Sequence, residues 1–236
     1  MADKIISINF TPNEELFKQI LDWTSFPSNN WQTIKRCFES KCLAVATVGQ
    51  EPIAFIAYEY SSVSIFISIA ETHPDYQGKG VGKAIVSNIC ERYKDSQFKA
   101  LFLRCAPAES QLAWEKIGFV LFPKRAMQNR NHIYMYLIFG EVSKVNLADE
   151  KMEALDNVIK IFDTELPKDD ATAKWYAEID LYQSSNKLKR PFLFFGNENW
   201  QIRIVKDGVE TVRDRYKDYD RKSAVYECFY IEELKR

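Results

Sequence analysis

Apolar and polar positions along the first 40 residues predict a strand followed by two helices. Residues 4–10 alternate between apolar and polar side chains, which is typical of a half-buried strand. Thr11, Pro12 and Glu14 then have the types and spacing of a helix start, with Thr11 as the cap. A second helix is expected over residues 31–38. The first helix would present one apolar face, made of Leu16, Phe17, Ile20 and Leu21.

The next part of the chain predicts an antiparallel meander and then alternating helices and strands. Three apolar, β-branched runs cover residues 42–48, 53–60 and 63–70, joined by short turn-like segments. Further helices are expected at 81–93 and 109–117, and further strands at 100–104, 120–122 and 133–139. Gly118 is suited to end the helix before it. The pattern defines one α/β (α+β) domain, a mixed sheet flanked by helices, over residues 1–140.

Residues 141–236 have a pattern of their own, which predicts a small α+β domain. Leu147, Leu155, Val158, Ile159 and Phe162 have helical spacing and predict an amphipathic helix, and a loop is expected at 166–170. Asp207-Gly208 between two alternating segments indicates a hairpin. Residues 213–222 intersperse basic and acidic side chains, which favours a solvated hairpin or loop. Strands are expected at 175–182, 191–195, 200–205, 208–213 and 224–231.

Composition narrows the class of protein. The formal net charge is −1, so the chain lacks the basic balance of a nucleic-acid-binding protein. Its five cysteines form no C-x-x-C pair and it has two histidines, so we expect reduced thiols and no metal site. The first residues lack the apolar core of a signal peptide, and no apolar run is long enough to span a membrane. We therefore expect a soluble, cytoplasmic protein.

The segment HPDYQGKGVGKAIV, residues 73–86, contains three of the eight glycines of the chain, at alternate positions just before a predicted helix. Glycines allow several backbone N–H groups to point at one place, and the helix start adds unpaired N–H donors. Such an arrangement favours a phosphate or pyrophosphate. The P-loop pattern fails, because Gly82-Lys83 is followed by Ala84, and the dinucleotide pattern G-x-G-x-x-G fails as well.

Two motifs resemble a known family. Gln77-x-x-Gly80-x-Gly82, after a strand and at the start of a helix, resembles the acyl-CoA pyrophosphate loop of the GNAT superfamily of N-acetyltransferases, whose pattern is [QR]-x-x-G-x-[GA]. The segment AWEKIGF, residues 113–119, resembles that family's L-Y-E-K-x-G-F helix end. The order of predicted elements is also similar to that of the family. The resemblance covers about residues 3–140.

The resemblance implies a mechanism and a set of donor-binding residues. A substrate amine would attack the thioester carbonyl of acetyl-CoA, with a base for the amine, donors for the oxyanion and a proton for the thiolate. The backbone of the strand before the loop would contact the pantetheine arm and polarise the carbonyl, and Trp114 would pack against the arm or the core. The acetyl-CoA-binding residues are therefore expected to be Ala70, Glu71, Thr72, Gln77, Gly78, Lys79, Gly80, Val81, Gly82, Lys83 and Trp114.

The chain departs from the family pattern at the positions of the general acid and the general base. Trp114 stands where the family often has Tyr, and Pro107 where it commonly has Asn. The thiolate would leave unassisted, through water, or with a proton from another donor such as Cys105, Ser110 or a nearby Tyr. For the base, Glu71 and Glu59 are the candidate catalytic residues.

We therefore expect an acetyl-CoA-dependent N-acetyltransferase that acts on a primary amine of a small molecule or a protein, with neither nucleic acid nor membrane as a partner. The alternative is a catalytically degenerate acyl-CoA-binding or protein-interaction module. For residues 141–236 the sequence leaves two roles open, acceptor recognition and dimerisation. The second role would make the protein a homodimer. The sequence leaves the acceptor and the acyl-chain length undetermined.

Overall fold

The computed structural model describes residues 5–124, 126, 132–165, 172–220 and 228–235. The chain forms two compact units. The first contains Met1–Val120 and Tyr134–Gly140, and the second contains Leu121–Ile133 and Glu141–Arg236. This grouping differs from the expected domains 1–140 and 141–236 in assigning residues 121–133 to the second unit.

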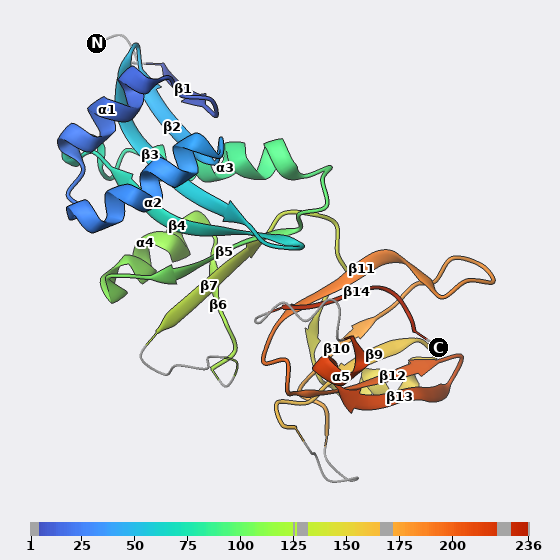
Figure 1. The fold of residues 1–236 in the computed structure, drawn as a ribbon. Helices are drawn as coiled ribbons and strands as arrows, with labels where there is room; N and C mark the ends of the chain where they lie inside the picture. The colour runs from blue at the N-terminus through green and yellow to red at the C-terminus, as the bar shows by residue number, and fades with distance from the viewer. Residues whose placement is uncertain (1–4, 125, 127–131, 166–171, 221–227, 236) are drawn as a thin grey trace. The chain divides into compact units, whose positions relative to one another are not determined.

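The first unit is built on a mixed seven-stranded sheet, with strands in the order β1-β2-β3-β4-β5-β7-β6 (Figure 1). Strands β1 to β4 pair antiparallel, and β4 pairs with β5 in parallel. The mixed sheet flanked by helices, as predicted, is confirmed. The helices are α1 (Glu14–Trp23), α2 (Ser28–Glu39), α3 (Val81–Tyr93) and α4 (Gln111–Ile117), and the strands are β1 (Ile6–Asn9), β2 (Leu43–Val48), β3 (Glu51–Tyr60), β4 (Ser64–Thr72), β5 (Ala100–Cys105), β6 (Val120–Leu121) and β7 (Ile133–Ile138).

Helices cover both faces of β3, the strand at the centre of the core. Trp23 of α1 packs its ring 5.8 Å from that of Phe55, and Tyr93 of α3 packs 6.2 Å from Tyr58. Phe55 and Tyr58 point to opposite faces of the strand, because they lie three positions apart and side chains alternate along a strand. Both are 0% exposed. The side chains of β3 therefore alternate between the face of α1 and α2 and the face of α3.

The predicted cap of the first helix is wrong. The side chain of Asn13, not of Thr11, accepts the hydrogen bond from the Leu16 N–H at 2.9 Å, so α1 begins at Glu14. Thr11 instead lies in a turn, where its N–H donates to Oδ1 of Asn9 at 2.8 Å. Asn caps a helix as well as Thr does, and the order of residue types in the sequence did not distinguish Asn13 from Thr11 as the cap.

In its described residues, the second unit holds two sheets and one short α-helix, α5 (Tyr216–Tyr219). One sheet has the order β13-β12-β9-β10-β8, and the other pairs β11 with β14. Asp207 (φ 52) and Gly208 (φ 75) both have positive φ, which confirms the predicted Asp-Gly hairpin. The strands are β8 (Asn146–Leu147), β9 (Val158–Ile161), β10 (Trp175–Glu178), β11 (Lys187–Phe195), β12 (Gln201–Lys206), β13 (Val209–Arg215) and β14 (Cys228–Glu233).

Two predictions for the second unit are wrong. Residues 147–162 do not form a helix: β8 is followed by the 3-10 helix Glu150–Ala154 and then by β9, which is buried between β10 and β12. The β-branched run at β9 fits a central strand, and its apolar spacing coincided with that of a helix. Residues 213–222 are not a solvated loop where described, because β13 extends to Arg215 and Tyr216 is 0% exposed. The loop expected at 166–170 lies outside the described residues.

Candidate active site

The glycine segment forms a left-handed turn that leads directly into α3. Gly78 has φ 72 and Gly80 has φ 77, and Gly80 is the residue that caps the helix. Residues with a Cβ rarely adopt such values, so both positions require glycine for their conformation. A Cβ added at either position would meet nothing within 4 Å. The space beside the turn is therefore open to a ligand.

The start of α3 has the chemistry of an anion site. Helical bonding begins with the Ala84 N–H, which donates to the carbonyl of Gly80 at 3.0 Å, so the N–H groups of the three residues before Ala84 have no helical acceptor. The first turn holds no acidic side chain, and Lys79 and Lys83 are exposed. The helix dipole, the free donors and the two cations together fit a pyrophosphate.

Gln77 attaches this turn to the end of β4. Its side-chain amide donates to the carbonyl of Thr72 at 3.1 Å. His73 contributes a second attachment: its N–H donates to the carbonyl of Ile53, and its ring Nδ1 accepts from the Asp75 N–H at 3.3 Å. The loop is thereby held at a fixed place relative to the strand that precedes it.

Strands β4 and β5 separate beside this loop. Their parallel pairing runs from Ser64 opposite Ala100 to Ile67 opposite Leu103 and does not continue beyond that pair in the described strands. The β4 edge that faces β5 is therefore not paired with a strand over Ala70, Glu71 and Thr72. The Thr72 carbonyl accepts from Gln77, and the other backbone groups on this edge are available to an extended ligand. The residues expected to bind the arm and those expected to bind the pyrophosphate follow one another along this path.

A β-bulge at Ser68 marks the point where the strands separate. On β3, Ala57 lies opposite Ile69 and Tyr58 lies opposite Ile67, which leaves Ser68 as the extra residue. A bulge twists its strand and redirects the backbone and side chain there. The hydroxyl of Ser68 donates to Oε1 of Glu59 at 3.1 Å, so the bulge and this carboxylate lie on one face of the sheet.

Glu59 and Glu71 differ in their hydrogen bonds. Oε1 of Glu59 accepts from the Ser68 hydroxyl and from Nη2 of Arg36, the latter at 2.5 Å, and 44% of the side chain is exposed. In Glu71 both oxygens accept: Thr24 Oγ1 donates to Oε2 at 2.5 Å, and the N–H of Ser25 donates to Oε1 at 3.0 Å. The Ser25 hydroxyl donates to Oε1 as well, at 2.5 Å. Glu71 therefore joins the end of α1 to β4, while Oε2 of Glu59 has no hydrogen-bond donor among the described residues.

Trp114 and Cys105 occupy positions relevant to the proton that the departing thiolate needs. Trp114 is half-buried on α4, with its ring 5.1 Å from that of Phe119 in an edge-to-face contact. Cys105 is buried at the end of β5, just beyond Leu103, where β5 has left β4. Burial raises the pKa of the Cys105 thiol, so this group is protonated at neutral pH.

The sequence did not indicate the partners of the two carboxylates. Arg36, Ser68, Thr24 and Ser25 were absent from the candidate residues, because each contact joins distant parts of the chain. The described residues include no group of three or more His, Cys, Asp or Glu side chains that could hold a metal ion. None of the helices among them has the length and apolarity that a membrane span requires.

Comparison with known proteins gives one family. The profile described as the acetyltransferase (GNAT) family matches residues 5–119. Of the curated proteins, none matches the chain significantly.

Solved acetyltransferases have similar folds. The ribosomal-protein-S18-alanine N-acetyltransferase from Escherichia coli is 17% identical with a TM-score of 0.45, over 61% of this chain and 100% of that chain. An acetyltransferase from Streptococcus agalactiae is 13% identical with a TM-score of 0.45, over 56% and 98%. An aminoglycoside 6'-N-acetyltransferase complexed with coenzyme A is 12% identical with a TM-score of 0.48, over 57% and 97%.

Proposed function

Residues 5–119 are an acetyltransferase domain of the GNAT family, with acetyl-CoA as co-substrate, and on this premise we propose that the protein acetylates a primary amine by direct attack on the thioester. The observation that carries the proposal is the continuous path from the unpaired edge of β4 to the left-handed turn at Gly78 and Gly80. Acetyl-CoA supplies an activated acetyl group. The protein supplies binding, orientation and proton transfer.

The residues of the path fit the two ends of the donor molecule. The N–H groups from Gly78 through Lys83 would hold the pyrophosphate, assisted by the charges of Lys79 and Lys83. The expected donor Gln77 is not part of this set, because its backbone N–H donates to the carbonyl of Pro74 at 3.3 Å. The backbone of Ala70, Glu71 and Thr72 would hold the pantetheine arm as an added strand segment. A backbone N–H of the same strand would stabilise the oxyanion as the carbonyl is attacked. Trp114 on α4 would pack against the arm.

Glu59 is the better candidate for the general base. No donor in the described part of the chain binds its Oε2, its side chain is partly exposed, and it lies across from the bulge where β4 leaves β5. The three hydrogen-bonding groups around Glu71 use the lone pairs that a base would need. We therefore assign Glu59 to removing the proton of the amine, directly or through a water molecule. Glu71 is assigned to positioning the connection between α1 and α2.

Cys105 is the candidate proton donor. As the amine nitrogen bonds to the acetyl carbon, the carbon–sulfur bond breaks and the departing sulfur needs a proton. The Cys105 thiol is protonated at neutral pH and lies next to the separation of the strands. The indole N–H of Trp114 is too weak an acid to replace a phenol. This chemistry needs no metal ion.

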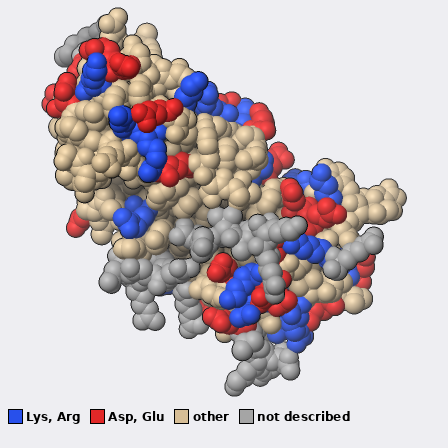
Figure 2. Space-filling model, viewed as in Figure 1, with Lys and Arg blue, Asp and Glu red and all other residues tan. Residues whose placement is uncertain are grey.

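The acceptor is proposed to be a primary amine of a small molecule or of a protein. The face of the sheet that carries α1 and α2 holds two carboxylates, Glu59 and Glu71, and one cation, Arg36, which favours a cationic amine over an anionic acceptor. Acidic and basic side chains are interspersed on the visible face of the first unit (Figure 2). Nucleic acid and membrane are not proposed as partners, and the cytoplasm is the proposed location. Residues 141–236 are proposed to act in acceptor recognition or dimerisation.

One observation supports a second candidate function. Because Trp114 occupies the place where the family often has Tyr, the domain could bind acetyl-CoA without turning it over, as a degenerate acyl-CoA-binding or protein-interaction module. A turnover assay separates the two: purified full chain is incubated with acetyl-CoA and a panel of primary amines, and free thiol is measured. Amine-dependent thiol release supports the enzyme. Tight acetyl-CoA binding with no release from any amine or amine-bearing protein supports the module.

A further inference from the structure

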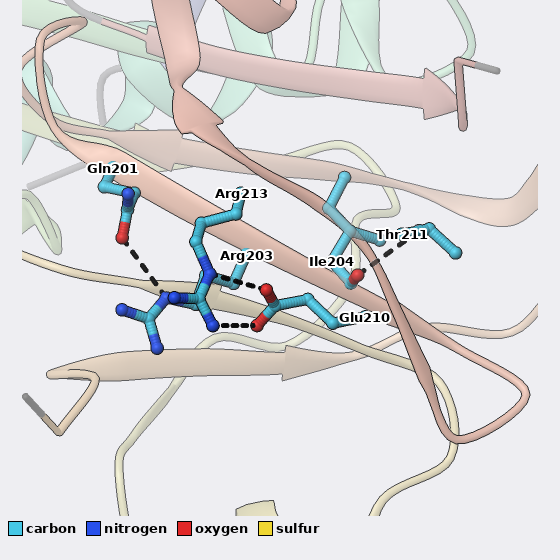
Figure 3. Close-up of polar contacts among 6 residues, drawn as sticks. All are labelled: Gln201, Arg203, Ile204, Glu210, Thr211 and Arg213. Carbon is cyan, nitrogen blue, oxygen red and sulfur yellow. Dashed lines mark hydrogen bonds and ion pairs between the residues drawn. The ribbon is translucent and has the colours of Figure 1, made fainter. Parts of the chain in front are cut away.

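Arg203 of β12 is a buried cation in the second unit. The residue is 8% exposed. Its Nε–H donates to Oε1 of Gln201 at 3.2 Å, and its guanidinium carbon lies 4.4 Å from the centre of the Phe162 ring. Figure 3 shows Gln201 beside the guanidinium, with the two terminal nitrogens directed away from the contact. These contacts fix the guanidinium plane and use one of its five N–H donors.

Arg203 stands between two other cations. It lies opposite Arg213 on β13 and opposite Lys160 on β9. Residues directly opposite in antiparallel strands project to the same face, so the three cations form one row across three adjacent strands. Like charges in such positions destabilise a sheet unless an anion lies among them.

The neighbouring cations have carboxylate partners. Lys160 pairs with Glu153 at 2.8 Å, and Arg213 pairs with Glu210 at 2.6 Å (Figure 3 shows the latter). Arg215, the next residue on the same face of β13, pairs with Asp218 at 2.6 Å. Arg203, the most buried of the four, makes no ion pair with any residue in the part of the chain that the structure describes. Because the residue is 8% exposed, water solvates this unpaired charge only in part, so its presence needs an explanation.

The terminal nitrogens of Arg203 are accessible. Among the described residues, the buried side-chain nitrogen and oxygen atoms without a hydrogen bond are Trp23 Nε1 and Ser64 Oγ. Both Nη atoms of Arg203 also have no hydrogen-bond partner among the described residues, and they are not among these buried atoms, so each keeps some contact with solvent. The aliphatic part of the side chain is thus buried, while the two terminal nitrogens of the guanidinium keep contact with solvent.

We infer that Arg203 anchors a binding site for an oxyanion, a carboxylate or a phosphate group carried by a ligand of the second unit. The two Nη groups match the spacing of two oxygens on such a group and bind it through parallel charge-assisted hydrogen bonds. Phe162 and Gln201 hold the guanidinium in place before binding. Arg213 and Lys160 add positive potential on both sides. The inference stands independently of the acetyl-transfer reaction.

The test is a titration of the ¹⁵N-labelled full chain with inorganic phosphate in one arm and acetate in the other, at constant ionic strength. Gly80→Asp is present in every sample, because it removes phosphate binding at the glycine loop. Arg203→Lys keeps the positive charge but removes the two Nη groups that would bind two oxygens in parallel. The control is Arg190→Lys, an exposed arginine of β11 in the same unit.

We expect saturable shifts of amide signals centred on Arg203 and Phe162, with at least one anion, unchanged by R190K and about tenfold weaker in affinity in R203K. The anion that binds with the higher affinity, phosphate or acetate, identifies the ligand group as a phosphate or a carboxylate. Equal affinity in R203K, or no saturable shift on β12 with either anion, overturns the inference. If R203K does not fold, the titration of the Gly80→Asp chain decides, since shifts centred elsewhere contradict the site.

Discussion

Ser25 and Glu71, 46 residues apart, are joined by two hydrogen bonds from the backbone N–H and the hydroxyl of Ser25 to the carboxylate of Glu71. Thr24, the residue that ends α1, donates to the other carboxylate oxygen. The connection between α1 and α2 is therefore fixed to the end of β4, directly before the glycine loop. Glu71, one of the two candidate bases, thus makes contacts that are typical of a structural anchor, and we propose this role for it.

Replacing Glu71 should reduce stability more than catalysis. Glu71→Gln exchanges one acceptor oxygen for an amide, leaving a donor of Thr24 or Ser25 unmatched, at a cost of about 1–3 kcal/mol in the free energy of unfolding. Ser25→Ala should cost about 1 kcal/mol. Urea unfolding of the two variants measures both values. Unchanged stability with abolished turnover would identify Glu71 as the base and contradict the assignment.

Replacing Glu59 should have the opposite effect. Glu59→Gln keeps the size of the side chain and removes the proton acceptor, so kcat/KM for the amine should fall by roughly a hundredfold or more. The KM for acetyl-CoA should change little, because Glu59 lies outside the donor path. Ser68→Ala, which removes one hydrogen bond to Glu59, should give a smaller loss. Activity of E59Q within about threefold of wild type would exclude Glu59 as the base.

The proton donor can be tested by loss and rescue. Cys105→Ala should lower kcat by roughly tenfold or more while leaving acetyl-CoA affinity unchanged, because the thiol acts on the departing sulfur. Adding Trp114→Tyr to C105A supplies a phenol on α4, where related domains often carry one, and should restore part of the loss. Wild-type kcat in C105A would show that sulfur leaves without this group.

Alkaline pH should destabilise the fold through buried thiols. Burial raises the pKa of Cys37 to about 12 from 9.0. Between pH 9 and pH 12 the unfolded chain loses this proton while the folded chain keeps it, so stability is full below pH 9 and falls as pH rises. The slope is about 1.4 kcal/mol per pH unit for each such proton. Cys37→Val should therefore show a shallower decline in urea unfolding between pH 8 and pH 11; identical slopes would contradict the buried-thiol account.

Local chemistry explains what could be predicted from the sequence. The predicted helix 81–93 matches α3, because Gly80 must end the turn and the apolar spacing after it is regular. The Asp207-Gly208 hairpin was predictable for the same kind of reason, since both residues tolerate positive φ.

The failures have a common cause in tertiary context. The helical spacing between Leu147 and Phe162 was outweighed by pairing of β9 with two neighbouring strands, which no local pattern reports. The apolar run of β4 gave no sign of the bulge at Ser68. The separation of β4 from β5 and the contact of Arg36 with Glu59 therefore could not be predicted from the sequence. The unpaired charge of Arg203 likewise depends on which strands lie beside β12.

The central claim is that the left-handed glycine turn before α3 binds acetyl-CoA, and calorimetric titration of acetyl-CoA into two variants tests it most directly. Gly80→Asp places a Cβ at φ 77 and a negative charge beside the pyrophosphate. Gly49→Asp is the matched control, with the same charge at φ 61 in the hairpin between β2 and β3, where a Cβ also meets nothing within 4 Å. We predict wild-type affinity in G49D and at least about a hundredfold loss in G80D, with both variants folded. Equal affinity of the two variants would contradict the account.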